Sequence, residues 1–245
     1  MLILRQLQFV PDAIFFVMNN LIETADGSHT IHSDSFNATY HSTHGSMQES
    51  KTVFIDAGLN YLIEKGLGKI NILEIGFGTG LNAFMTYLEA KNSPVNIQYD
   101  SFELYPIGAE IAAKLNYPEC LGAESEKDIF HSLHKNPGSS IAVELCDKQH
   151  FKFNLFIDNF EQHSFNSSYD LIYFDAFAPS IQPQLWQESF LRKMYDALNE
   201  DGVLVTYCAQ GAFKRALKSV GFKVEALPGP AGKREMTRAH KKITL

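Results

Sequence analysis

The stretch INILEIGFGTGLNAF, residues 70–84, indicates the fold class of this 245-residue chain. An apolar run ends in the acid Glu74, and then three glycines follow at alternate positions: Gly76, Gly78 and Gly80. A helical pattern of apolar residues begins directly after them. A buried strand that turns through glycines into a helix is typical of a doubly wound α/β sheet. Ligands of such sheets bind beyond the carboxyl ends of the strands, so this turn should line a binding site.

The glycine turn does not match the two familiar phosphate-binding patterns. A dinucleotide fingerprint places its third glycine three residues after the second, where this chain has Leu81. A P-loop requires a lysine after the turn, and none follows here. The pattern is E-x-G-x-G-x-G, which leaves open a tight turn without a ligand.

Acids also end the next strand-like runs. Glu103 ends VNIQYDSFE, 27 residues after Gly76, near the spacing of about 20 expected for a carboxylate that binds ribose hydroxyls. Asp158 ends FNLFID in the same way, where it can accept a hydrogen bond from the adenine amine or simply cap a turn. Together with Glu74 and the glycines, these acids suit an adenosine without phosphates, and S-adenosylmethionine is the leading candidate.

The run YDLIYFDAFAPSIQPQLW, residues 169–186, carries the strongest local signal for chemistry. Asp175 leaves an apolar strand and enters a proline-containing loop that faces the same crevice as the glycine turn. A carboxylate there can accept an N–H hydrogen bond, orient the nitrogen lone pair and help to remove a proton. Asp175 could instead cap the helix expected over 183–199, but Ser180 or Gln182 lies closer to that helix start. The catalytic interpretation is therefore preferred.

Two aromatic residues of this run could flank an acceptor base. Phe177 and Trp186 each offer a ring on which any base can stack. The position of Trp186 also fits the core side of its helix, and this interpretation is the stronger one for that residue.

Beyond the glycine turn, strands and helices alternate to the end of the chain, which predicts a mostly parallel sheet with one antiparallel partner at its edge. SIAVELCD and HFKFNLFID are extended runs that could form a hairpin. A helix should begin at Pro106. Residues 1–68 fall outside the alternation and are expected to form an N-terminal extension of short strands and a helix, with residues 69–245 as the main domain.

Composition argues for a soluble globular protein. The chain is 45% hydrophobic and 20% charged, without an apolar run of about 18 residues or a signal-peptide pattern. Its three cysteines are odd in number and far apart, which fits a reducing, cytoplasmic location. Four histidines form a repeated H-x2-H pair, but no cysteine or acid nearby completes a zinc set, so no metal is expected: His29, His32, His41 and His44.

Charge is distributed unevenly. The chain has a net charge of −7, yet residues 201–245 carry nine Lys and Arg against three Asp and Glu. Such a segment can bind a polyanion, although each charge could also be merely solvated. Lys233 and Arg234 lie in its Gly/Pro-rich loop PGPAGKREM, and arginine suits phosphate contacts.

Four motifs in this order, GFGTGLN, SFELYPI, YFDAFAP…P…LW and GKREM, resemble the methyltransferase domain of the MnmC family, in particular its standalone form MnmD. The resemblance covers roughly residues 40–240. It implies a class I, Rossmann-like methyltransferase with a mostly parallel seven-stranded sheet and S-adenosylmethionine as donor. It also implies tRNA as partner, with the primary amine of 5-aminomethyl(-2-thio)uridine at the wobble position as acceptor.

The resemblance also assigns residues. The glycines and Glu103 would bind the cofactor, Asp158 the adenine, and Asp175 would lie at the methyl-transfer site, where Ala176 replaces a family glycine. Further matches fall near the active site or in the KRE run: Tyr40, Ser42, Gly45, Lys233, Arg234 and Glu235.

Bifunctional relatives carry a second, flavin-dependent domain. This chain has no second dinucleotide fingerprint, so no FAD is expected, nor a membrane or an obligate protein partner. Two alternatives remain open: a methyl- or aminopropyl-transferase for a small amine, and an inactive binding module.

Overall fold

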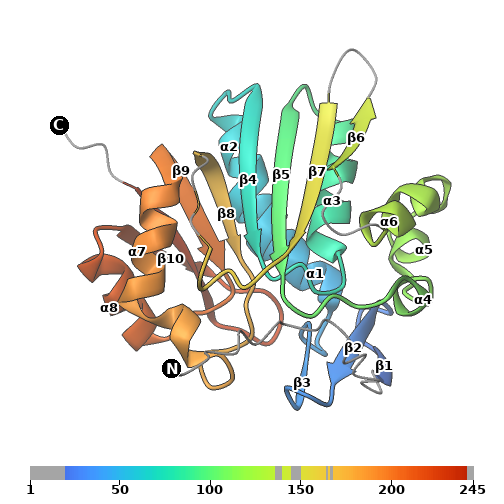
Figure 1. Ribbon diagram of the computed structural model, residues 1–245, viewed down its shortest axis with the longest axis horizontal. Coiled ribbons are helices and arrows are strands. Elements are labelled where there is room, and N and C mark those ends of the chain that lie inside the picture. Colours follow the sequence, from blue (N-terminus) through green and yellow to red (C-terminus); the bar gives the residue numbers. More distant parts are fainter. Residues whose placement is uncertain (1–19, 136–139, 145–149, 164, 166–167, 242–245) are drawn as a thin grey trace, which may run out of the picture.

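The computed structural model describes residues 20–135, 140–144, 150–163, 165 and 168–241. One large sheet runs through the molecule in the order β10-β11-β9-β8-β4-β5-β7-β6, with helices on both faces (Figure 1). Its strands are β4 (Lys69–Ile75), β5 (Asn96–Glu103), β6 (Ser140–Glu144), β7 (His150–Ile157), β8 (Tyr169–Phe174), β9 (Leu198–Thr206), β10 (Lys223–Pro228) and β11 (Glu235–His240).

The centre of the sheet is parallel. Strand β4 pairs in parallel with β5 and β8, and the parallel pairing continues outward to β7 and β9. The carboxyl ends of these five strands therefore lie at the same end of the sheet. This confirms the mostly parallel sheet predicted from the sequence.

The antiparallel strands are placed differently from the prediction. Strand β11 is antiparallel to both neighbours and lies between β9 and β10, so the strand at that edge is β10. At the opposite edge β6 pairs antiparallel with β7, which confirms the hairpin and adds an eighth strand to the expected seven.

Apolar side chains of β4 alternate between two cores, as the two-residue period of a strand requires. Ile70 and Ile72 belong to one core, and Leu73 and Ile75 to the other. The first core is covered by α3 (Leu81–Lys91), α4 (Ala109–Ala112), α5 (Tyr117–Cys120), the 3₁₀ turn η2 (Glu124–Glu126) and α6 (Lys127–Leu133). The second is covered by the 3₁₀ turn η4 (Pro183–Trp186), α7 (Glu188–Ala197) and α8 (Gly211–Ser219).

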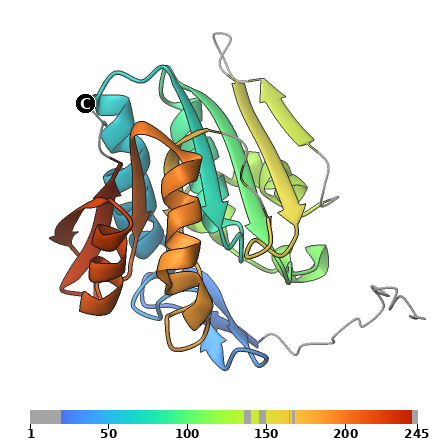
Figure 2. The ribbon, with the colours of Figure 1, turned by 60° about the vertical axis from the view of Figure 1, so that its left-hand side comes forward.

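The N-terminal part adds a small sheet and one long helix. Strands β1 (Asn20–Glu23), β2 (His29–Ser33) and β3 (Ala38–Thr39) form an antiparallel sheet near the edge at which the parallel strands end (Figures 1 and 2). The helix is built of α1 (Ser46–Ser50), the π-helical η1 (Lys51–Asn60) and α2 (Tyr61–Glu64).

The long helix packs into the first core of the main sheet. Val53, Phe54 and Leu59 belong to the same buried cluster as the β4 side chains. Gly58 allows this contact, because a Cβ there would lie 3.1 Å from Val205. The boundary at residue 68 stays a prediction, but the hydrophobic core extends across it.

Two predicted helices are shorter than expected. The helix expected from Pro106 is only α4, and the helix expected over 183–199 divides into η4 and α7, because Gln187 between them is extended. Trp186 fixes this bend: its indole N–H donates to the carbonyl of Phe177 at 2.9 Å. Among the residues that the structure describes, no helix combines the length and apolar character needed to cross a bilayer.

Candidate active site

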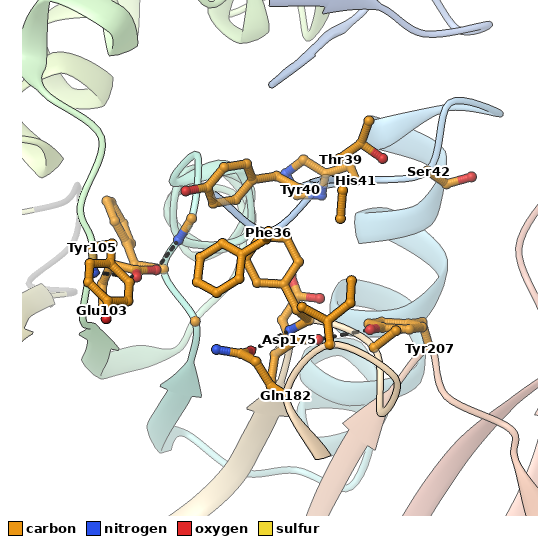
Figure 3. A pocket seen from close by; sticks show the side chains of 18 of the residues that line it. Phe36, Thr39, Tyr40, His41, Ser42, Glu103, Tyr105, Asp175, Gln182 and Tyr207 are labelled. Atoms are coloured by element: carbon orange, nitrogen blue, oxygen red, sulfur yellow. Dashed lines mark hydrogen bonds between the residues drawn. The ribbon is translucent and has the colours of Figure 1, made fainter. Parts of the chain in front are cut away.

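A pocket opens at the carboxyl ends of the parallel strands, between the large sheet and the small one (Figure 3). Its wall comes from the turns after β4, β5 and β8, from the segment that joins β2 to α1, and from single residues after β9 and before β11. The pocket therefore joins parts of the chain that are far apart in sequence.

Two glycines of the turn after β4, Gly76 and Gly78, line the pocket. Gly76 has φ 93°, and a Cβ there would lie 2.6 Å from the Asp175 carbonyl oxygen. Gly78 has φ 53°, and its Cβ would lie 2.9 Å from the Tyr40 ring. Only glycine adopts these left-handed angles without strain, and any side chain would also collide with its neighbours. The backbone of the turn thus lies directly against the pocket, and Gly80 begins α3.

Glu103 ties the end of β5 to this turn. One carboxylate oxygen accepts the N–H of Gly78 at 3.0 Å, and the other accepts the N–H groups of Leu104 at 2.9 Å and Tyr105 at 2.8 Å. Burial raises the pKa of the Glu103 carboxyl, while these hydrogen bonds oppose the shift. Glu103 lines the pocket, and its binding of a cofactor stays a prediction.

The other two acids predicted on the cofactor side do not line this pocket. Glu74 is fully buried below the turn, where it accepts hydrogen bonds from Ser101 Oγ at 2.6 Å and Asn82 Nδ2 at 3.1 Å. Burial raises its pKa to about 8. Asp158 is exposed and pairs with His163 at 2.8 Å. The strand-end pattern therefore brings only Glu103 of the three acids to the pocket surface.

Asp175 comes directly after β8, which flanks β4 on the side opposite to β5. Its N–H donates to the Ile75 carbonyl at 3.0 Å, and its carboxylate accepts a hydrogen bond from Asn82 at 2.8 Å. Burial is the main cause that raises its pKa to about 7; Glu49 adds to the increase, while Asn82 and Lys233 oppose it. Neither η4 nor α7 has a side-chain cap, so the capping alternative for Asp175 is wrong.

Asn82 is a site residue that the sequence analysis missed. Its amide nitrogen donates to both Glu74 and Asp175, so one buried side chain joins the two carboxyl groups. The signal available in the sequence is a polar residue in an otherwise apolar first turn after the glycines.

Aromatic rings form the outer part of the pocket. The Phe177 ring centroid lies 4.6 Å from that of Phe36 and 5.2 Å from that of Tyr40, and all three line the pocket. Phe36, in the turn between β2 and β3, was not predicted. Trp186 is buried in the second core, 4.9 Å from Phe174 between ring centroids, which confirms its core interpretation.

An ion pair between Glu49 and Lys233 lies beside Asp175. Lys233 donates to Glu49 Oε1, and the backbone N–H of Ser42 donates to Glu49 Oε2 at 2.9 Å. The Lys233 ammonium also lies 4.1 Å from the centroid of the Tyr207 ring. Lys233 therefore faces the pocket, whereas Arg234, its neighbour in the predicted tRNA pair, is exposed.

The four histidines have separate environments. His41 is buried and shares a hydrogen bond of 2.7 Å with Thr79 Oγ1, and burial lowers its pKa to about 4. His29 contacts the Lys114 carbonyl instead. No group of three or more possible metal ligands occurs in the described part of the chain.

The fold and the glycine-lined pocket define a class of enzyme. Residues 125–242 match the profile of a family described as S-adenosyl-L-methionine-dependent methyltransferase. This part of the chain is a methyltransferase domain of that family, and the mostly parallel sheet agrees with the sequence prediction.

The chain is also similar to particular members of that class. It is 30% identical over 246 residues to the tRNA 5-methylaminomethyl-2-thiouridine biosynthesis bifunctional protein MnmC of Actinobacillus pleuropneumoniae, covering 90% of this chain and 35% of that protein. It thus spans about a third of the length of the curated relatives that it matches. The predicted resemblance to the MnmC methyltransferase domain is confirmed.

Two solved structures share its fold. The crystal structure of MnmC2 from Aquifex aeolicus has a TM-score of 0.68 at 25% identity, covering 93% of this chain and 72% of that one. Spermidine synthase from Thermotoga maritima has a TM-score of 0.51 at 15% identity, covering 93% and 74%, a likeness of fold alone.

Proposed function

We propose that this methyltransferase modifies tRNA, transferring a methyl group to the primary amine of 5-aminomethyl(-2-thio)uridine at the wobble position. One observation carries the proposal: the Asp175 carboxylate lines the same pocket as the glycine turn, in a chain similar to MnmC. A carboxylate at that place can accept the N–H of an amine and remove its proton.

The cofactor end of the pocket fits S-adenosylmethionine. Gly76 and Gly78 line the pocket without side chains, so a ligand can approach the backbone of the turn. Glu103 offers a carboxylate for ribose hydroxyls, and we keep Asp158, at the end of the adjacent strand β7, as the candidate for adenine. The bound cofactor supplies a methyl group on a positively charged sulfur, which an acidic pocket favours.

Glu74 has a different part in this proposal from the one expected of it. It is buried below the turn and hydrogen-bonded to Ser101 and Asn82, so it supports the turn and Asp175 instead of touching the cofactor. No flavin is part of the proposal.

The acceptor end fits a base that carries an amine. Tyr40 and Phe177 offer rings against which a uridine can pack, and Asp175 lies below Tyr40 in Figure 3. An amine is protonated in water at neutral pH, so it must lose a proton before its lone pair can accept a methyl group. Asp175, with a pKa of about 7, is suited to take that proton near neutral pH.

The basic C-terminal segment supports tRNA as the partner. Lys214 and Arg238 form ion pairs with Glu235 and Glu225, so phosphate binding is better assigned to the exposed side chains of Arg234 and Lys218. Replacing both by alanine should weaken tRNA binding and reduce the slope of log affinity against log salt by about one for each phosphate that the variant no longer binds. An unchanged slope in a salt-titrated binding assay would mean that the tRNA binds elsewhere.

A small amine is the second candidate acceptor. The acidic pocket would also attract a free diamine, and the spermidine synthase fold is similar. Mass spectrometry after incubation with methyl-labelled cofactor separates the two: we expect label in the wobble nucleoside of tRNA bearing the aminomethyl group. Label only in an added diamine would refute the tRNA proposal.

A further inference from the structure

Two carboxylates line the acceptor end of the pocket, and the proposed methyl transfer uses only one of them. Asp175 is assigned the proton, while Glu49 lines the same pocket without a role. The side chain of Glu49 is only 8% exposed. Its position is fixed by the Ser42 N–H at 2.9 Å. A carboxylate this enclosed requires a positive partner, because an unpaired buried charge is costly.

Lys233 is that partner in the structure, and its position allows another cation to replace it at Glu49. Its side chain is 32% exposed, and it lies in the loop between β10 and β11, where Gly232 has φ 80°. The Lys233 ammonium contacts Glu49 in the ion pair and also the face of Tyr207. Lys233 and Tyr207 also line a second pocket, together with Cys208 and Arg234. A flexible lysine can therefore leave Glu49 for that pocket.

We propose that Glu49 binds the acceptor amine in its cationic form, and that Lys233 takes the place of this cation while no acceptor is bound. The inference rests on the proposed amine acceptor and adds the group that recognises its charge. One proton leaves the ammonium for the Asp175 carboxylate, and the nitrogen keeps the electron pair of the broken N–H bond.

This arrangement explains why both carboxylates are present. Glu49 selects a positively charged group over a neutral one of the same shape, and Asp175 then removes the proton that blocks the lone pair. The groups that interact with Asp175 come from six segments of the chain: Glu49, Glu74, Asn82, Tyr99, Tyr207 and Lys233. Of these, Glu49 raises the pKa of Asp175, and Lys233 lowers it.

The first test is binding, which needs no turnover. An anticodon stem-loop with 5-aminomethyluridine and one with 5-hydroxymethyluridine are titrated against protein saturated with S-adenosylhomocysteine. Wild-type protein should prefer the amine. Glu49→Gln, which keeps an oxygen for the Ser42 N–H, should lose about 10- to 100-fold of this preference, the value of a hydrogen bond between charged groups.

The second test follows the pH dependence of methyl transfer in single turnovers. Glu49→Gln removes a negative neighbour, so the acid limb should move to lower pH. Lys233→Met removes a positive neighbour, so that limb should move to higher pH. Opposite shifts would show that both charges act on the Asp175 carboxyl in the pocket, and unshifted profiles in both variants would contradict the placement of the pair beside Asp175.

An ion pair on the protein surface provides the matched control. Lys127 and Glu119 form an ion pair of two exposed side chains, so Glu119→Gln and Lys127→Met should change neither the preference nor the pH profile. Thermal unfolding and cofactor titration check that each variant is folded.

Each outcome decides one proposal. If folded Glu49→Gln keeps the wild-type preference for the amine, the inference is wrong, whatever the protein methylates. If wild-type protein prefers the amine in binding but transfers no methyl group to tRNA, the proposed function fails and the inference stands. If wild-type protein binds both stem-loops equally, Glu49 does not recognise the charge.

Discussion

The two ends of the pocket are built in different ways. The cofactor end consists of the turn after β4 and the end of β5, two neighbouring parallel strands that follow each other in the chain. The acceptor end joins Phe36, Glu49, Asp175, Tyr207 and Lys233, which come from five separate segments. Local sequence patterns describe the first end well, because strand pairing alone creates it. The second depends on how distant segments pack.

The largest expected effect tests the acceptor end. Asp175→Asn keeps the size of the side chain but removes its ability to take a proton, so methyl transfer should fall about 100- to 10,000-fold. Cofactor affinity should change little, because the backbone of the glycine turn is unaltered. Single-turnover rates and cofactor titration measure the two effects separately. A wild-type rate in this variant would remove Asp175 from the mechanism.

A second effect at the same end is its pH dependence. In the proposed transfer the ionised Asp175 takes the proton, so the rate should fall about tenfold per pH unit below its pKa of about 7. This pKa in the folded state lies above the ordinary aspartate value of 3.8. The ionised carboxylate therefore destabilises the fold above pH 7, and this cost fades as pH falls toward 4.

Thermal unfolding tests whether the ionised Asp175 carboxylate destabilises the fold. Asp175→Asn should unfold at a higher temperature than wild type at pH 8, and the difference should shrink at pH 5. An equal difference at both pH values would contradict the raised pKa.

The cofactor end should respond to changes in backbone shape. Gly78→Val places a branched side chain at φ 53° and against Tyr40. The cofactor dissociation constant should therefore rise about 5- to 30-fold, the equivalent of about 1–2 kcal/mol. Gly66→Val is the matched control, since Gly66 has φ 87° but nothing within 4 Å of its Cβ. It should lower stability without lowering cofactor affinity. An equal decrease of affinity in both would show that strain alone is responsible.

The smallest expected effect compares two strand-end acids that look alike in sequence. Glu103→Gln disturbs three backbone hydrogen bonds at the pocket wall, whereas Asp158→Asn changes an exposed side chain paired with His163. As the proposed acceptor of one exposed hydrogen bond from adenine, Asp158 should contribute about 1 kcal/mol or less, so Asp158→Asn should lower cofactor affinity by about fivefold at most. An unchanged affinity would remove Asp158 from the proposed cofactor site.

The same contrast explains what the sequence could predict. The order of strands and helices, the glycine turn and Glu103 follow from periodicity and from the rule for parallel strand ends. Glu74 shares the strand-end pattern, but its side chain points below the turn. Successive side chains of a strand point to opposite faces, so a shift of one residue decides whether an acid faces the pocket. Asn82 offered only a polar residue in an apolar turn and Phe36 gave no pattern, since the role of each depends on a partner from another segment.

Lys233 illustrates the limit most clearly. In the sequence it belongs to a basic run, and charge alone suggests a phosphate contact. In the structure it pairs with Glu49, 184 positions earlier in the chain. No rule of spacing predicts such a contact, and only the packing of the long helix against the sheet creates it.

The π-helical segment Lys51–Asn60 has a consequence for the length of this helix. Such segments form when a helix accommodates an extra residue, and they occur often near functional sites. Deleting one residue between Lys51 and Asn60 should let an ordinary α-helix form, which turns everything before the deletion by about 100° around the axis. Glu49 would then leave the pocket although every side chain of the site is still encoded. A shortened variant that folds and keeps its preference for the amine would contradict this.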